Sequence, residues 1–268
     1  EAAGYSVEQA TELFGYLTGM AVPLVNLATI LTAALATSIV PAISEAYSLG
    51  NYQSVLERIG GAVRLANMVT IPGSIALFLL AEPVAGLIYH APRAGNAVQI
   101  LAAGVFLLGV HQVTTGVLQG IGRTSIPVIN MGVSAISKVL LNWTLAANPS
   151  LGIQGAAWAT LVDIGIAASL NLFFVHRYTG FCMDVRNLIQ SLAAAMTMGG
   201  VIYLCYGEVI ATTRNNLLAT LSGMIVGGIV YGAIMLAIGG IRERDIVRIP
   251  YVGIKMTSLF RTLGLLRV

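Results

Sequence analysis

Seven long apolar stretches follow one another along this chain of 268 residues, and they constrain its fold more than any other feature. Each comes close to, or exceeds, the ~20 residues that an α-helix needs to cross the hydrocarbon core of a bilayer. They cover residues 13–46, 61–81, 96–119, 125–147, 152–175, 187–206 and 217–240. The pattern predicts an all-α, polytopic membrane bundle of about seven transmembrane helices.

The composition excludes a water-soluble fold. Asp, Glu, Lys and Arg make up 9% of the residues and hydrophobic residues 57%, whereas soluble domains carry roughly 25% charged residues. A surface that faces water needs more charge than this, so a soluble enzyme and a nucleic-acid-binding domain are excluded. The two cysteines, Cys182 and Cys205, form no CxxC motif and no metal-ligand spacing. We therefore expect neither a metal nor another cofactor, and no nucleic-acid partner.

The first apolar stretch is too long for one straight crossing. Its 34 residues include Pro23 and Pro41, and a straight helix of that length would reach about 50 Å. We expect one span whose helix is bent or broken at these prolines. The short connections 120–124 and 148–150 predict that the third and fourth helices, and the fourth and fifth, lie side by side.

Two shorter segments are amphipathic. One covers residues 51–59, and the other lies beyond Pro250, within the basic segment 241–268. Both are predicted to be helices that lie in the membrane interface, and the alternative is a short helix packed against the bundle.

The distribution of basic residues predicts the orientation of the chain in the membrane. Of the 14 Lys and Arg residues, eleven fall on one side: Arg58, Arg64, Arg123, Arg177, Arg186, Arg242, Arg244, Arg248, Lys255, Arg261 and Arg267. Arg93 and Arg214 fall on the other side, and Lys138 lies inside a span. Because basic residues collect in cytoplasmic loops, we expect the N-terminus outside and the C-terminus in the cytoplasm.

No catalytic pattern accompanies these spans. The chain contains no HExxH, GxSxG or Walker motif, so we do not expect an enzyme and predict neither catalytic residues nor metal ligands. Three pairs of glycines have GxxxG spacing: Gly116 and Gly120, Gly223 and Gly227, and Gly228 and Gly232. Such pairs are typical of close contact between helices, here within one chain.

Polar residues of three consecutive spans fall on one face of each predicted helix. At 100° per residue, they lie within about 100° in the third span and about 140° in the fourth. They are His111, Gln112, Thr115 and Gln119 in the third span, Asn130, Ser134, Ser137, Lys138 and Asn142 in the fourth, and Thr160, Asp163 and Asn171 in the fifth. Such stripes are typical of helices around a hydrophilic cavity. Alternatively, the groups bond to one another inside a packed bundle.

Among these residues, Lys138 and Asp163 indicate function most strongly, because an ion inside the membrane is expensive and usually functional. They lie about 20 Å and 16 Å from opposite ends of adjacent spans. In a core about 30 Å thick they reach similar depth, so we predict an ion pair. His111 fits either a satisfied core imidazole or a cavity wall. Arg64, one turn inside its span, is another candidate, and snorkelling to the cytoplasmic surface is its alternative.

Several segments resemble the stage V sporulation protein B family. They are LTGMAVPLVNL (17–27), ALATSIVPAISEA (34–46), LQGIG (118–122), KVLLN (138–142) and LGIQGAA (151–157). This family belongs to the multidrug/oligosaccharidyl-lipid/polysaccharide exporter superfamily, which includes the lipid II flippase MurJ. Members have fourteen helices, in two six-helix lobes around a central cavity plus two extra helices.

The resemblance implies that this chain corresponds to the C-terminal half. Residues 1–180, with five spans, would be a MATE/MurJ-like C-terminal lobe, residues 181–240 the two extra helices, and 241–268 a cytoplasmic tail. The N-terminal lobe would then be a missing partner, and the basic residues that the family places there have no counterpart here.

The function that this implies is a flippase. The substrate would be a polyprenyl-pyrophosphate-linked cell-wall (peptidoglycan) or polysaccharide precursor, moved by alternating access, with membrane lipids as the other partners. Expected substrate-binding or cavity residues are Lys138, Asp163, Asn130, Ser134, Asn142, His111, Gln112, Gln119 and Arg64. Two alternatives remain: a cation-coupled multidrug or metabolite exporter of the same superfamily, and a membrane scaffold that does not transport.

The orientation can be tested with an impermeant thiol reagent on intact cells. In a background without Cys182 and Cys205, we expect a cysteine at Ser150 to react and one at Ser54 to stay protected, because the basic loops face the cytoplasm. Permeabilised cells, in which both should react, provide the control. Labelling at Ser54 but not at Ser150 would reverse the predicted orientation.

Overall fold

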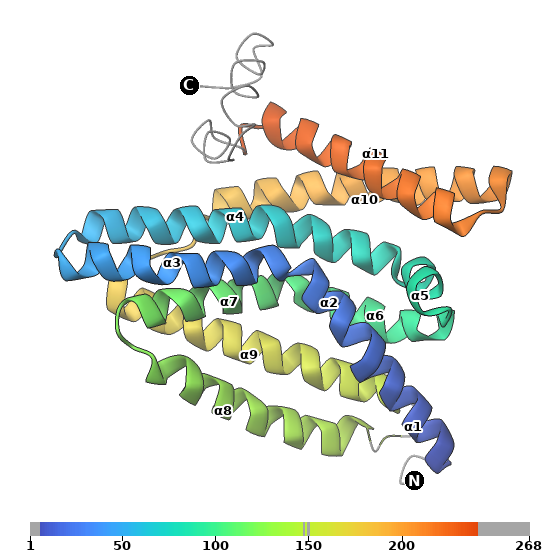
Figure 1. Ribbon diagram of the computed structural model, residues 1–268, viewed down its shortest axis with the longest axis horizontal. Helices are drawn as coiled ribbons and strands as arrows, with labels where there is room; N and C mark the ends of the chain where they lie inside the picture. Colours follow the sequence, from blue (N-terminus) through green and yellow to red (C-terminus); the bar gives the residue numbers. More distant parts are fainter. Residues whose placement is uncertain (1–5, 147, 149–150, 241–268) are drawn as a thin grey trace. The chain divides into compact units, whose positions relative to one another are not determined.

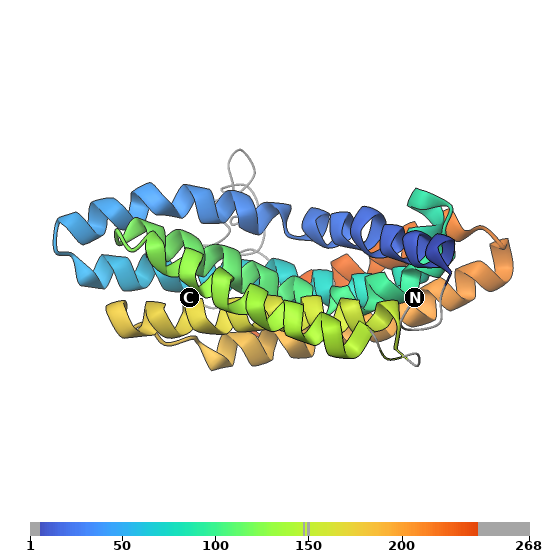
Figure 2. The same ribbon diagram turned by 90° about the horizontal axis from the view of Figure 1, so that it is seen from below.

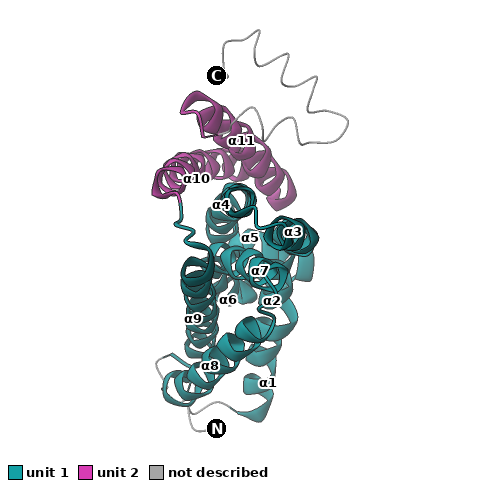
Figure 3. Cartoon of the chain, turned by 90° about the vertical axis from the view of Figure 1, so that its left-hand side faces the viewer, with its two compact units in different colours: residues 1–183 teal, residues 184–268 magenta. Residues whose placement is uncertain are grey.

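A computed structural model of the chain describes residues 6–146, 148 and 151–240, and the described part is helical, with no strand. Six of its helices are long and apolar enough to cross a membrane, or seven if one bent pair counts as a span. This agrees with the predicted all-α bundle of about seven spans. The chain divides into two compact units, residues 1–183 and 184–268 (Figure 3).

The first apolar stretch forms a bent series of helices: α1 (Val7–Gly15), the π-helix η1 (Tyr16–Ala21), α2 (Val22–Ala28) and α3 (Ile30–Ser48). The prediction of a break is right, but its position at Pro41 is wrong. Pro23 lies in the first turn of α2, directly after the π-helix, where its missing N–H is tolerated. Pro41 lies inside the continuous helix α3, whereas the break falls at Thr29.

Thr29 stabilises this break through its side chain. Its hydroxyl lies 3.3 Å from the carbonyl oxygen of Val25 and 3.2 Å from that of Asn26. The amide Nε2 of Gln112, on α7, lies 3.5 Å from the Thr29 hydroxyl. Polar groups at the break thus find partners inside the protein, as a helix interruption at membrane depth requires.

The second stretch lies within the 28-residue helix α4 (Tyr52–Leu79), which is followed by α5 (Ala81–Tyr89). The predicted interfacial helix over 51–59 is therefore wrong. Asn51 caps α4 by accepting a hydrogen bond from the backbone of Ser54 (3.0 Å), so the helix begins early and continues without interruption. Val55 and Ile59 are buried in a core cluster of the first unit, which agrees better with the alternative of packing against the bundle.

The third stretch is bent. After η2 (Pro92–Ala94), the helices α6 (Gly95–Ala102) and α7 (Gly104–Gly120) meet at an angle of 50°. The Ser74 hydroxyl donates a 2.6 Å hydrogen bond to the carbonyl oxygen of Ala102, next to the bend. A carbonyl group released by the bend is therefore satisfied by a neighbouring helix.

The fourth stretch forms α8 (Ser125–Leu141) with a terminal π-helix, η3 (Asn142–Ala146), and the fifth forms α9 (Ile153–Thr179). The predicted packing of α8 on α9 is present, but the predicted packing of α7 on α8 is wrong. α8 packs on α9, whereas α7 packs on α3, α4 and α9. In Figure 1, α9 lies between α7 and α8, and Figure 2 shows the same helices from below.

Small residues explain where α7 packs instead. A Cβ atom on Gly116 would collide with the carbonyl oxygen of Ala36 on α3, and one on Gly120 would lie 2.7 Å from the Cβ of Ile43. Backbone contact with α3 therefore occupies this face of α7. The prediction that this GxxxG pair marks contact within the chain is confirmed.

The second unit is an antiparallel hairpin of α10 (Val185–Thr213) and α11 (Asn216–Ala237). Cβ atoms on Gly223 and Gly227 would lie 3.6 Å and 2.5 Å from atoms of Ile202, so this spacing also marks helix contact. A Cβ atom on Gly228 or Gly232 would meet no described atom within 4 Å. The predicted amphipathic helix beyond Pro250 and the predicted tail 241–268 lie outside the described residues.

The contact between α3 and α7 can be tested with a matched pair of substitutions. Gly116→Ala is expected to destabilise the protein by about 1–3 kcal/mol, because the added methyl group has to push α3 away. Gly132→Ala on α8 adds a methyl group where nothing lies within 4 Å, and it should be neutral or slightly stabilising. Thermal unfolding in detergent measures both. Equal effects of the two variants would contradict the close contact.

Candidate functional site

The polar side chains of α8 face its neighbour, and its apolar side chains face outward. Asn130 and Ser134 are buried, with 2% exposure each. The large exposed side chains of this helix are apolar: Val128, Ile129, Met131, Val133, Ile136, Val139 and Leu140. This distribution is typical of a helix with lipid around most of its circumference. The polar stripe is therefore the face that attaches α8 to α9.

At one end of this face, a chain of buried amides joins three helices. Nδ2 of Asn130 donates a 2.8 Å hydrogen bond to Oδ1 of Asn171 on α9. Nδ2 of Asn171 in turn donates one of 2.8 Å to the hydroxyl of Thr115 on α7. Ser134, one turn beyond Asn130, donates within its own helix to Met131. For Asn130, bonding inside a packed bundle describes the observed contact better than an open cavity does.

Two turns further along α8, the predicted ion pair is present. Nζ of Lys138 lies 3.4 Å from Oδ2 of Asp163 on α9, and the two side chains are 36% and 21% exposed. The similar depth of the two residues in adjacent antiparallel helices thus correctly predicted their contact. Because both side chains keep part of their surface exposed, other molecules can reach this pair, unlike the buried amides.

Polar atoms without partners lie on the same helices. Nε2 of His111 on α7 is buried and has no hydrogen-bond partner among the described residues. Oδ1 of Asn142, one turn after Lys138, is also buried without a described partner. Unsatisfied groups of this kind are costly at membrane depth, which is typical of a site that binds a ligand.

The remaining candidates lie elsewhere. Oε1 of Gln112 accepts a 2.6 Å hydrogen bond from the Thr32 hydroxyl, so this amide joins α7 to α3. Gln119 is exposed, next to the last residue of α7. Arg64 is 9% exposed and lies twelve residues after Tyr52, the first residue of α4. Because α4 begins well before the predicted span, Arg64 lies near the middle of this helix. Its snorkelling to the cytoplasmic surface stays a prediction.

Two residues of the amide chain were outside the predicted site. Asn171 and Thr115 were recognised as polar residues on the faces of their helices, and Asn171 proves to be the central link, with 0% exposure. The signal was an amide inside an apolar span, which needs a partner. In the part of the chain that the structure describes, no three His, Cys, Asp or Glu side chains form a group that could hold a metal ion.

Part of the chain matches a known protein family. Residues 17–144 match the MatE family model. The matched range runs from the π-helix η1 to the π-helix η3 and includes Lys138, whereas Asp163 lies on the next helix.

The chain is homologous to stage V sporulation protein B and to the lipid II flippase MurJ, both from Bacillus subtilis (strain 168). It is 27% identical to the former over 94% of this chain and 48% of that protein. It is 24% identical to the latter over 86% of this chain and 44% of that protein. The chain thus spans about half the length of these relatives.

The fold has a solved counterpart. A structure of lipid II flippase MurJ in an inward closed conformation superimposes with a TM-score of 0.73, over 92% of this chain and 50% of that one. Sequence identity over this match is 18%, so the likeness shows a shared fold. Fold and homology together indicate a multi-span helical membrane protein that is similar to MurJ.

Proposed function

We propose that this chain forms one half of a membrane transporter that flips a polyprenyl-pyrophosphate-linked saccharide, a peptidoglycan or polysaccharide precursor, across the bacterial cell membrane by alternating access. Homology to a lipid II flippase supports the class of substrate. The proposed orientation has the N-terminus outside and the C-terminus in the cytoplasm, as the basic residues indicate.

The observation that carries this proposal is the accessible ion pair of Lys138 and Asp163, with Nζ and Oδ2 3.4 Å apart. A cation at membrane depth is usually functional, and a pyrophosphate is the anionic part of the proposed substrate. The unsatisfied atoms of His111 and Asn142 can bind sugar hydroxyls, which both donate and accept hydrogen bonds. The exposed apolar face of α8 suits the lipid tail.

The proposed mechanism is competition for the lysine. A pyrophosphate that approaches Lys138 replaces Asp163 as the partner of the ammonium group. The Asp163 carboxylate then lacks the nearby positive charge that favours its ionised form. Asp163 can then accept a proton, which couples the transport cycle to proton movement. Asn130 and Ser134, buried against α9, would keep α8 in position, while Gln112 holds α7 to the break at Thr29.

We also propose that transport needs a second lobe. The chain spans 48% of stage V sporulation protein B, and a cavity between two lobes needs both of them. We expect residues 1–268 alone, reconstituted as a monomer, to flip no lipid-linked saccharide, because a single lobe encloses no pathway. Fluorescent lipid-linked sugar in liposomes measures this, and full-length MurJ provides the positive control. Flipping by a demonstrated monomer would contradict the proposal.

Substitutions at the ion pair test the mechanism in the transport-competent protein. Lys138→Ala is expected to reduce flipping and affinity for lipid-linked sugar by about tenfold to a hundredfold, because a charge-assisted hydrogen bond contributes roughly 1.5–3 kcal/mol. Asp163→Ala should reduce flipping but not affinity. The matched control is Arg58→Ala, which breaks an ion pair with Glu45 of the same 3.4 Å length but greater exposure, 37% and 66%, and should leave transport unchanged.

The double variant separates recognition from structure. If Lys138→Ala with Asp163→Ala restores transport that either single change abolishes, the pair is structural and the proposed competition is wrong. If Lys138→Ala keeps the affinity and flipping rate of the unmodified protein, the lysine has no role in recognition.

An exporter of cationic drugs or metabolites is the second candidate, because the half-buried carboxylate of Asp163 is the kind of group that binds an organic cation. Binding assays distinguish the two functions. Saturable binding of an organic cation that Asp163→Ala abolishes, without binding of lipid-linked sugar, would favour the exporter. A membrane scaffold would bind neither ligand.

A further inference from the structure

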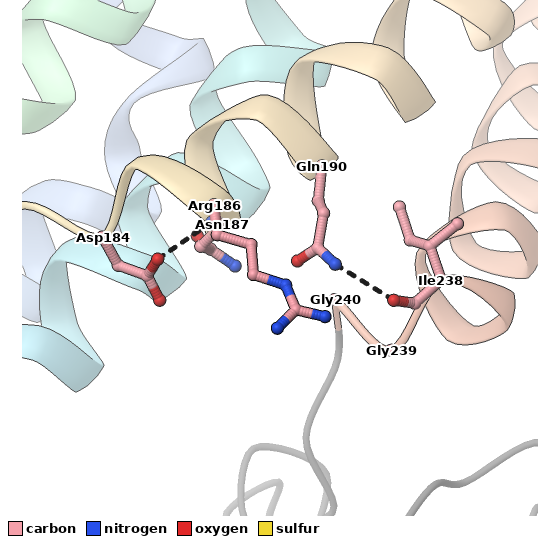
Figure 4. Close-up of a pocket in the computed structure, with 7 residues that line it drawn as sticks. All are labelled: Asp184, Arg186, Asn187, Gln190, Ile238, Gly239 and Gly240. Atoms are coloured by element: carbon pink, nitrogen blue, oxygen red, sulfur yellow. Dashed lines mark hydrogen bonds between the residues drawn. The ribbon is translucent and has the colours of Figure 1, made fainter.

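A polar cavity of about 220 Å³ lies in the second unit, where α10 begins and α11 ends (Figure 4). Its walls come from both helices: Asp184, Arg186, Asn187, Gln190, Ile238, Gly239 and Gly240. Nε2 of Gln190 donates a 3.1 Å hydrogen bond to the carbonyl oxygen of Ile238, which joins the two walls. Gly239 has a φ of +69°, a conformation that glycine adopts readily and that turns the chain at the end of α11.

The lengths of the helices place this cavity at the level of lipid headgroups. The connection between α10 and α11 lies at Arg214 and Asn215, and α11 then continues for 22 residues. At 1.5 Å per residue the helix covers about 33 Å, close to the ~30 Å hydrocarbon core of a bilayer. If the connection lies at one membrane surface, the cavity lies at the other.

One side of the cavity offers hydrogen-bond donors. Arg186 contributes an exposed guanidinium group, and in Figure 4 its side chain extends between Asp184 and Gln190. The cavity also lies at the start of α10, where the first N–H groups of a helix have no intrahelical partner and the helix dipole favours an anion. Such a combination is suited to a phosphate group.

The cavity also offers two side-chain acceptors. Asp184 contributes a carboxylate, one oxygen of which caps α10 through the backbone N–H of Asn187 (3.2 Å). The side chain of Asn187 is 4% exposed, and its Oδ1 atom has no hydrogen-bond partner in the described part of the chain. A buried amide oxygen without a partner, in the wall of a cavity, needs a donor from a ligand or from water.

We propose that this cavity binds the headgroup of a zwitterionic aminophospholipid, phosphatidylethanolamine. Its phosphate would contact Arg186 and the start of α10, and its ammonium group would donate to Asp184 and Asn187. Phosphatidylcholine has the same charges but no N–H donor, and phosphatidylglycerol has no cation to offset the carboxylate. The proposed site is independent of the transported substrate.

Lipid retention provides the test. The chain is incorporated into vesicles that contain equal amounts of phosphatidylethanolamine, phosphatidylglycerol and phosphatidylcholine, extracted with mild detergent, and analysed for bound lipid by native mass spectrometry. We expect phosphatidylethanolamine to be retained at least tenfold over phosphatidylcholine. Arg186→Gln should abolish this preference. The matched control Arg214→Gln, at the other end of the same helix, should preserve it.

A second variant tests the ammonium contact without loss of the helix cap. Asp184→Asn keeps an N-cap of similar quality but removes the negative charge, so retention of phosphatidylethanolamine relative to phosphatidylglycerol should fall at least fivefold. Circular dichroism and size-exclusion profiles like those of the unmodified protein would show that the variants are folded.

Three results would overturn the proposal. One is equal retention of phosphatidylethanolamine and phosphatidylcholine, and another is equal retention by Arg186→Gln and the unmodified chain. The third is release of the lipid by millimolar inorganic phosphate, which would identify a site for free phosphate. Because the readout is lipid binding, failure of this site would leave the proposed flippase function untouched, and failure of flipping would leave this site untouched.

Discussion

The structure depends on one constraint: polar groups at membrane depth must find partners inside the protein. This explains why interruptions of the helices coincide with contacts between helices. The break at Thr29 is stabilised by its own hydroxyl and by Gln112, and the bend at Ala102 by Ser74. The same requirement attaches α8 to α9, since α8 buries its amide and hydroxyl groups there and exposes its apolar side chains.

The spans were predictable because their signal is local. Long uncharged stretches of about 20 residues indicate membrane helices whatever the tertiary structure. The positions of the breaks were not predictable in the same way. Pro41 is the residue that most disfavours a helix in its stretch, yet α3 continues through it, and the chain breaks at Thr29. The position of a break depends on polar partners on other helices, and the sequence does not reveal which helices come into contact.

The candidate site also has a part that could be predicted from the sequence and a part that could not. The ion pair of Lys138 and Asp163 was predictable, because two opposite charges at similar depth in adjacent antiparallel helices strongly favour contact. The buried role of Asn130 was not, since a polar stripe can face a cavity or a neighbouring helix. Gln112 was misplaced for a related reason: α7 packs against α3 through Gly116 and Gly120, and this contact turns part of its polar surface toward α3.

The attachment of α8 is uneven along its length, and this suits a helix that responds to a ligand. The amide contact of Asn130 with Asn171 is buried and neutral, so no solute competes for it. The contact of Lys138 with Asp163 is partly exposed and ionic, so an anion can take one partner and leave the other behind. A ligand that does so would weaken the attachment near the end of α8, while the amide chain still holds the first half of the helix. Ligand binding at Lys138 and Asp163 would thereby shift α8, while the buried amide contacts keep this helix in the bundle.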